Sequence, residues 1–488
     1  MNIDPLRFVG FPLSQVWHWV AAFFLIGALA VPAVAQEATA ESPEGEQAGL
    51  LTTENLIGTA VSLANRAYPE VDSAIQRFRN GDVQGAIDYL NQAKEKYPKL
   101  PPTDITLAKM QLAARNGNAV RFLLERVVVE HPDDPEAYLL LADQSFMGGR
   151  TTEAQALFEI AEPLVEKFDE NEKRKQNFVV RVMAGRSAVA ERRGQWDEAY
   201  QLLNKWIEAD PDSAAAHQRL GVALFKLKKN SEAIKQFNKS RELNPDVGHP
   251  FVVMGQLFSQ EGDKVNAKKA FEKAYKENMA DAKVAQAYAE WLIQEDDLDE
   301  AQAVAAKLLE LTPDSVVALL LDGIVAHMQG NVDRAEQALQ KALKNDPSNA
   351  TATNILALLL IESDDNADRE RALRFAQVNA ERFESSVQAN ITLGWVLYKL
   401  KRGSEATAAL QKGAQAGQLQ ADSAYLVAKI MSEQEGQKDK AAQALEQVLN
   451  QKTGLFLFRR EAQKLLEQLK GSAAAPTTGE DGGAPPAK

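Results

Sequence analysis

Cysteine is absent from the 488-residue chain. Without it, the protein can form no disulfide, no thiolate nucleophile and no lipid-modified cysteine. Histidine is scarce as well, and the four residues beyond the N-terminal region, His131, His217, His249 and His327, are far apart in the sequence. There is no His-Glu-x-x-His motif and no pair of histidines at i, i+4, so we expect no metal site.

The sequence motifs of common enzymes are missing too. No GxxxxGK[ST] loop and no GxSxG turn occurs, and no strand pattern is present on which either could lie. Adjacent carboxylates, such as Asp133-Asp134, Asp296-Asp297 and Asp364-Asp365, fall in turns, where aspartate caps the start of a helix. We therefore expect no catalytic residues, no cofactor and no enzymatic activity.

Positive charge is in deficit, because 55 lysines and arginines face 68 aspartates and glutamates, for a net charge of −13. A protein that binds nucleic acid needs a basic face to neutralise phosphates, and the sequence shows no cluster of basic residues interleaved with aromatics. We therefore expect no nucleic-acid partner. The acidic excess by itself indicates a solvated surface.

The longest apolar run lies near the N-terminus, at residues 19–31, and Ala33-Val34-Ala35 follows it. This arrangement is typical of a signal peptide that is cleaved after Ala35. The run is shorter than the ~20 residues that span a bilayer. Residues 1–35 are thus predicted to be a signal peptide, which places the chain in the periplasm or outside the cell. The alternative is an uncleaved anchor that faces the periplasm, the only membrane association that we expect.

A pattern of 34 residues recurs along most of the chain and is clearest in residues 214–247. There, leucines at helical spacing are followed by a polar turn, a second apolar periodicity begins near Ala233, and Asn244-Pro245-Asp246 ends it. The same frame locates eleven repeats, which begin at Ala67, Pro101, Pro135, Val180, Ala214, Gly248, Ala282, Val316, Ala350, Val387 and Ala421. Each repeat is predicted to be a pair of helices.

Small residues occupy the positions where the two helices of a repeat would cross. The eighth residue of every repeat is Gly, Ala or Ser. Once small insertions in repeats nine and eleven are allowed, the twentieth is Ala in all but the second repeat, which has Val120. Small side chains let helix backbones approach closely. The twenty-fourth position is large and apolar, as at Phe237 and Phe271, and a proline such as Pro211 or Pro245 follows the second helix and stops it.

These features resemble the tetratricopeptide repeat (TPR) family over residues 67–453. The resemblance implies an all-α fold, a right-handed α-solenoid of about eleven TPR-type helix-turn-helix repeats. It also implies a non-catalytic scaffold that binds protein or peptide partners. With the signal peptide, the chain is similar to exported bacterial TPR proteins that act as adaptors in assembly, secretion or exopolysaccharide systems of the cell envelope. A membrane-tethered TPR regulator or sensor with an uncleaved anchor is the alternative.

The frame breaks once. Repeats one to three occupy residues 67–168 and repeats four to eleven occupy residues 180–453, so residues 169–179 form a helical insertion or joint. A solvated extension, a docking element and a hinge all remain open for it. Residues 36–49 are predicted to be a disordered linker and residues 50–66 a capping helix. At the other end, residues 454–470 are predicted to form a second capping helix and residues 471–488 a disordered tail.

In the TPR family, the first helices line a concave groove with positions 2, 5, 6, 9, 12 and 13 of each repeat. In repeats eight to ten these positions hold an apolar stripe, formed by Val317, Leu320, Leu321, Ile324, Met328, Asn354, Ile355, Leu358, Ile361, Ile391, Trp395 and Tyr398. The stripe is predicted to bind a partner, with Trp395 and Tyr398 as anchors and Asn354 holding the partner backbone. The alternative is that a tighter superhelix or the C-terminal helix buries the stripe.

Overall fold

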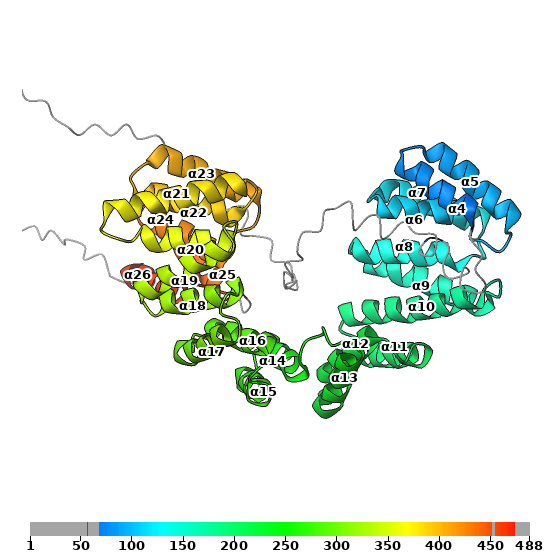
Figure 1. Ribbon diagram of the computed structural model, residues 1–488, viewed down its shortest axis with the longest axis horizontal. Coiled ribbons are helices and arrows are strands. Elements are labelled where there is room, and N and C mark those ends of the chain that lie inside the picture. The colour runs from blue at the N-terminus through cyan, green and yellow to red at the C-terminus, as the bar shows by residue number, and fades with distance from the viewer. Residues whose placement is uncertain (1–55, 57–67, 451–453, 474–488) are drawn as a thin grey trace, which may run out of the picture. The chain divides into compact units, whose positions relative to one another are not determined.

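The computed structural model describes residues 56, 68–450 and 454–473. These residues contain 23 helices, labelled α4 to α26, and no strand (Figure 1). The described part of the chain is therefore all-α, as the repeat pattern predicts. Among these helices, none combines the length and the hydropathy that a membrane span requires.

The chain divides into two compact bodies, with the boundary between residues 253 and 254. The N-terminal body contains α4 (Pro69–Arg79), α5 (Val83–Lys96), α6 (Thr103–Ala113), α7 (Gly117–Glu130), α8 (Pro135–Met147), α9 (Thr151–Lys167), α10 (Glu172–Arg192), α11 (Trp196–Ala209), α12 (Ala214–Lys226) and α13 (Asn230–Leu243). Helix α14 (Pro250–Gln260) carries the boundary.

The C-terminal body continues with α15 (Lys264–Glu277), α16 (Ala282–Gln294), α17 (Leu298–Leu311), α18 (Val316–Met328), α19 (Val332–Asn345), α20 (Ala350–Leu360), α21 (Asn366–Arg382), α22 (Val387–Lys399), α23 (Gly403–Ala416), α24 (Ala421–Ser432), α25 (Lys438–Leu449) and α26 (Arg459–Ala473). Helices α4 to α25 make eleven consecutive pairs. The first helix of a pair begins at the predicted start of its repeat or two residues later, except in repeat four.

Small residues allow the two helices of each repeat to pack closely. The residues at the twentieth position are no more than 2% exposed in any of the eleven repeats. At the eighth position, a Cβ added to Gly255 would lie 2.7 Å from the ring of Phe271, which is at position 24 of the same repeat. A Cβ on Gly394 would lie 2.6 Å from Leu410, again at position 24. The positions of the small and large residues in the sequence thus determine where the two helices of a repeat cross.

Capping residues fix where the helices begin. The carboxylate of Asp134 accepts the N–H of Glu136 at the start of α8, and that of Asp365 accepts the N–H of Ala367 at the start of α21. Asp297 stands at the same position before α17, but its side chain makes no capping hydrogen bond and instead pairs with Lys268. The predicted capping role is therefore seen for Asp134 and Asp365, whereas Asp297 has an ion-pair partner instead.

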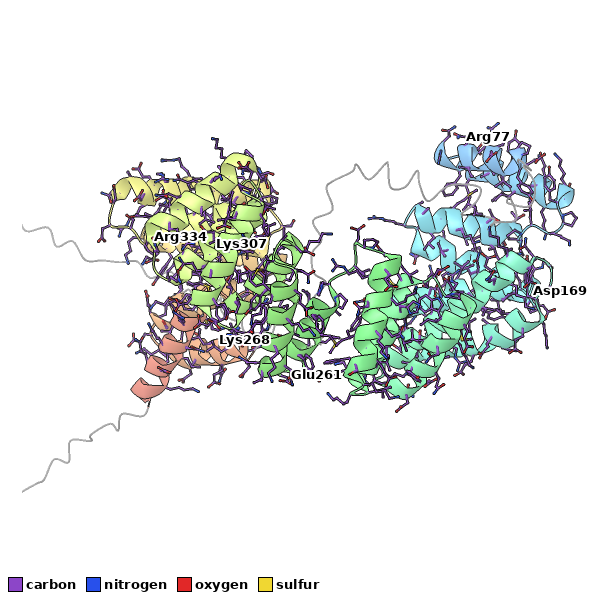
Figure 2. All side chains as sticks on the ribbon, turned by 60° about the horizontal axis from the view of Figure 1, so that its bottom comes forward. Arg77, Asp169, Glu261, Lys268, Lys307 and Arg334 are labelled. Carbon is purple, nitrogen blue, oxygen red and sulfur yellow. The ribbon has the colours of Figure 1, made fainter. Side chains whose placement is uncertain are left out.

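Two long helices, α9 and α10, lie on either side of the break in the repeat frame. Helix α9 ends at Lys167, and residues 172–179 of the predicted insertion are the first turns of α10. Asp169, labelled in Figure 2, is exposed, whereas Arg174 and Phe178 are buried against the N-terminal body. The insertion is therefore not simply a solvated extension, because its middle contributes to the core.

The two ends of the chain are described only in part. The predicted signal peptide 1–35, the linker 36–49 and the N-terminal capping helix 50–66 lie outside the described residues, except for Leu56. Leu56 is buried, and its carbonyl accepts a hydrogen bond of 2.9 Å from Lys109. At the other end, the C-terminal helix α26 begins at Arg459 rather than at Gly454 and continues to Ala473. Gly454 has a φ of +98°, which a helix does not accommodate. The remainder of the predicted tail, residues 474–488, also lies outside the described residues.

Candidate partner-binding surfaces

The apolar stripe lies on α18, α20 and α22, with Ile361 directly after α20. Most of it is buried: Leu321, Ile324, Asn354, Ile355, Leu358, Ile361, Ile391 and Trp395. Val317 is 37% exposed, and Leu320, Met328 and Tyr398 are half-buried. The stripe is therefore not an open apolar patch, and its role in binding a partner remains a prediction.

The C-terminal end of the chain contributes to this burial. Leu358, Ile361, Ile391 and Trp395 belong to one hydrophobic core with residues of α24, α25 and α26. These four side chains are therefore buried by other parts of the chain, as the alternative interpretation of the stripe predicts. The expected partner contact of Asn354 is also occupied, because its carbonyl oxygen accepts a 2.7 Å hydrogen bond from Asn379.

The two predicted anchors lie side by side but are already engaged. The rings of Trp395 and Tyr398 stack with their centroids 6.1 Å apart. The Tyr398 hydroxyl donates a 2.7 Å hydrogen bond to Glu433, just after α24. Burial and this hydrogen bond raise the pKa of Tyr398 to about 12, so the hydroxyl stays protonated and remains a donor.

Residues 454–458, here called the C-terminal strap, lead from the last repeat into α26. The ring of Phe458 packs edge-on to His327 of α18, at 5.7 Å, and stacks on Tyr425 of α24, at 5.0 Å. His327 and Tyr425 both stand at groove positions, in repeats eight and eleven respectively. Just beyond the strap, Arg460 donates a 2.6 Å hydrogen bond to Asp296 in the turn of repeat seven.

The polar and titratable groups around the strap are largely desolvated. The N–H of Phe458 donates to the carboxylate of Asp422, at 3.3 Å. Burial raises the pKa of Asp422 to about 7, although the N–H groups of Phe458 and Leu457 favour its charged form. Burial likewise lowers the pKa of His327, while the carboxylate of Glu461 acts in the opposite direction. A neutral His327 ring suits its contact with the Phe458 ring.

A second surface lies in the N-terminal body, where the sequence analysis proposed no site. This half-open cavity measures about 550 Å³, within the range of about 300–1,000 Å³ that is usual for ligand pockets. Its lining comes from α6, α7, α8 and α10 and comprises Leu112, Gly117, Asn118, Arg121, Leu140, Asp143, Gln144, Met147, Arg150 and Arg181. Leu112, Leu140, Asp143, Met147 and Arg181 stand at groove positions of repeats two to four, so the register applied to these repeats could have located it.

The cavity combines an exposed apolar residue with arginines. Met147 is 84% exposed. Arg181 contacts Asp143 at 2.7 Å, and Arg150 contacts Glu153 at 2.6 Å. Three arginines line the cavity, and each is paired with a carboxylate: Arg181 with Asp143, Arg150 with Glu153, and Arg121 with Glu125 and Glu153. The surface thus places an exposed apolar side chain beside arginines that remain partly exposed.

Histidines and carboxylates of the folded chain have structural roles. Within residues 68–450 and 454–473, no three His, Asp or Glu side chains are grouped so as to hold a metal ion. His217 makes hydrogen bonds to Gln236 and to the Pro211 carbonyl, as a structural histidine does. Its position in the core is explained by these bonds.

Stacked helix pairs with small residues at their crossings define the chain as an α-solenoid of helical hairpins. Family models described as tetratricopeptide repeat match residues 77–143 and 190–249, and a second such model matches residues 292–350 and 323–377. The chain therefore contains tetratricopeptide repeats in both of its bodies. This fold is a scaffold for protein–protein interaction, and the matches indicate no enzyme family.

Individual relatives resemble the chain only distantly. A segment of 158 residues is 24% identical to tetratricopeptide repeat protein 37 of Xenopus laevis and spans 31% of this chain and 10% of that protein. Yeast Tom70 is 17% identical over 83% of this chain and 96% of its own, with a TM-score of 0.37. YrrB, described as a TPR protein with an unusual peptide-binding site, is 18% identical over 48% and 96%, with a TM-score of 0.23. These similarities carry no information on the partners of this chain.

Proposed function

We propose that this chain is an exported scaffold of the bacterial cell envelope that holds partner proteins in an assembly, secretion or exopolysaccharide system. The repeat fold supports protein binding, and the apolar run at residues 19–31 followed by Ala33-Val34-Ala35 supports export. The alternative is a tethered regulator or sensor that keeps its N-terminal anchor. The observation that carries the binding function is the exposed Met147 within an arginine-lined groove.

The partner segment that fits this groove has an apolar side chain next to a carboxylate. The apolar side chain would bury Met147 and Leu112, and methionine adapts its shape to such a contact. The carboxylate would pair with one of Arg121, Arg150 and Arg181, since a guanidinium binds a carboxylate through two parallel hydrogen bonds. Each of these arginines is already paired with at least one carboxylate but remains partly exposed, so the carboxylate of the partner would compete for it.

Substituting Met147 by aspartate is expected to weaken partner binding at least tenfold, because the change removes the apolar contact and repels an acidic segment. The partner is first identified by photocrosslinking in cells from residue 147, then purified, and its affinity for the variant is measured by calorimetry. Val129→Asp is the matched control, since Val129 is an exposed apolar residue of the same body that lies outside the cavity. Equal affinities of the two variants would contradict the assignment.

Export is tested by the mass of the mature protein isolated from the producing bacterium. We expect the mature chain to begin at Gln36, because small residues precede this position at the predicted cleavage site. Replacing Ala35 by arginine is expected to block cleavage and leave residues 19–31 attached. A natural mature chain that still contains these residues would instead support the tethered regulator.

A further inference from the structure

The contacts of the C-terminal segment exceed what a capping helix requires. A cap needs only to cover the last repeat, and α26 does so by packing on α25 and α24. In a repeat protein each repeat contacts its neighbours. Phe458 nevertheless reaches repeat eight at His327, and Arg460 reaches repeat seven at Asp296, which is 164 positions earlier in the chain. The segment therefore crosses the groove of the C-terminal body as a ligand would.

We propose that residues 454–473 are a built-in ligand of the groove formed by repeats seven to eleven, and that a partner helix preceded by an aromatic residue and an arginine displaces them. The proposal rests on the protein-binding function proposed above but concerns the other body of the chain. Because residues 454–473 fill the groove in the structure, their side chains indicate which chemical groups a competing partner would need. The strap supplies Phe456, Leu457 and Phe458, and the first turn of α26 supplies Arg459 and Arg460.

The aromatic part of the segment fills an apolar site. Phe456 and Leu457 are buried, and Phe458 contacts both His327 of repeat eight and Tyr425 of repeat eleven. An aromatic ring held between two others is the kind of anchor that contributes most to peptide binding. Removing the segment would expose these rings together with part of the apolar stripe.

The polar part of the segment leaves its site incompletely satisfied. Arg460 reaches Asp296 through Nε and Oδ2 only, and the other oxygen of this carboxylate, Oδ1, is buried without a hydrogen-bond partner. A buried acceptor without a partner is destabilising, because it has lost its hydrogen bonds to water. A guanidinium that approached Asp296 with both of its parallel N–H groups would satisfy both oxygens. A partner arginine can therefore bind this carboxylate better than Arg460 does.

The charges of the groove suit a basic ligand. Asp296 of repeat seven lies at Arg460, and Glu433 of repeat eleven lies beside Tyr398. The pair between Arg460 and Asp296 is partly exposed, at 45% and 32% of the two side chains, so solvent can reach it. Ion pairs of this kind contribute little stability. The basic end of the segment is thus the part that a competing ligand can release first.

The test uses the full-length chain with Phe458→Ser and Arg460→Glu, which weaken the built-in ligand, and a fluorescent synthetic peptide of residues 454–473 as the probe. We expect the unaltered chain to bind the peptide at least tenfold more weakly than the double variant does. A peptide that carries the same two substitutions is expected not to bind. Lys464→Glu is the control chain, because it makes a similar charge reversal on an exposed position of α26.

Three outcomes would overturn the proposal. The first is a double variant of unchanged helicity that does not bind the peptide. The second, which requires no variant, is amide hydrogen exchange in α26 of the unaltered chain that is as slow as in α24. The third is a dimer of the unaltered chain that the two substitutions dissociate, which would indicate exchange of the segment between copies. The assay contains no cellular partner. A negative result would therefore contradict this proposal without contradicting the proposed binding of a partner at Met147.

Discussion

Replacing Glu136 by glutamine is expected to destabilise the N-terminal body by about 3–5 kcal/mol. Glu136 is buried between the ammonium group of Lys109 and the guanidinium of Arg174, which lies 2.6 Å away. Arg174 is itself only 3% exposed, and the rings of Phe168 and Phe178 lie 5.1 and 5.2 Å from its guanidinium. The neutral glutamine would leave Lys109 without its carboxylate partner, and it would leave Arg174 with Asp134 alone, 3.7 Å away, in a largely buried place.

The same substitution is expected to change how stability depends on pH. Burial alone would raise the pKa of Glu136, but the charges of Lys109 and Arg174 prevail and lower it to about 2. Since this value lies below the pKa of an unfolded glutamate, about 4.3, the carboxylate stabilises the fold above that pH. This stability is lost as the pH falls toward 2. The difference between the two proteins should therefore shrink on acidification.

Urea denaturation at pH 7 and pH 3 measures both effects. Asp143→Asn provides the control, because its pair with Arg181 is 42% and 30% exposed and should contribute less than about 1 kcal/mol. Equal losses for the two variants at pH 7 would show that the Lys109–Glu136–Arg174 cluster does not stabilise the fold more than a surface pair does.

Replacing Gly255 by alanine is expected to cost about 1–3 kcal/mol, although alanine favours a helix. The added Cβ would lie 2.7 Å from the ring of Phe271. That ring cannot move aside, because it is buried and stacks on Trp291 and Tyr288, with centroids 5.3 and 6.2 Å away. Either the helices of repeat six separate or the aromatic stack shifts.

Thermal unfolding of two further variants checks this explanation. Gly403→Ala, in the same body, is expected to be neutral or slightly stabilising, since a Cβ there meets no atom within 4 Å. Combining Gly255→Ala with Phe271→Leu should cost less than the sum of the two single changes, because a smaller side chain makes room for the new methyl group. A Gly255→Ala variant as stable as Gly403→Ala would refute the close crossing.

The sequence predicted the repeats well because their determinants are local. The residues at positions 8 and 24 contact each other, as Gly255 and Phe271 do. They belong to the same repeat, and only the short turn between its two helices separates them. Helix starts depend on capping residues such as Asp134, and these act within three positions. A 34-residue window therefore contains nearly all the information that forms one helix pair.

Burial at the groove was harder to predict, because it depends on segments far away in the sequence. Leu358 and Trp395 stand at groove positions, yet they are buried in a core that includes α24 to α26. Arg174 lies in a charged run typical of a solvated segment, but it is buried because Glu136 lies opposite it. Met147, which the sequence analysis did not single out, remains exposed because no described segment covers it.

By itself, the sequence determined the fold class, the repeat register and the absence of the usual catalytic and metal-binding motifs. Only the tertiary structure decided which part of the groove is filled and which is open. The reason is that spacing in the sequence assigns a residue to a face of its helix, whereas its exposure depends on what packs over that face. In the C-terminal body, Phe458 and Arg460 are among the residues that pack over the groove. They contact His327 and Asp296, which are far away in the sequence, so no local pattern predicts these contacts.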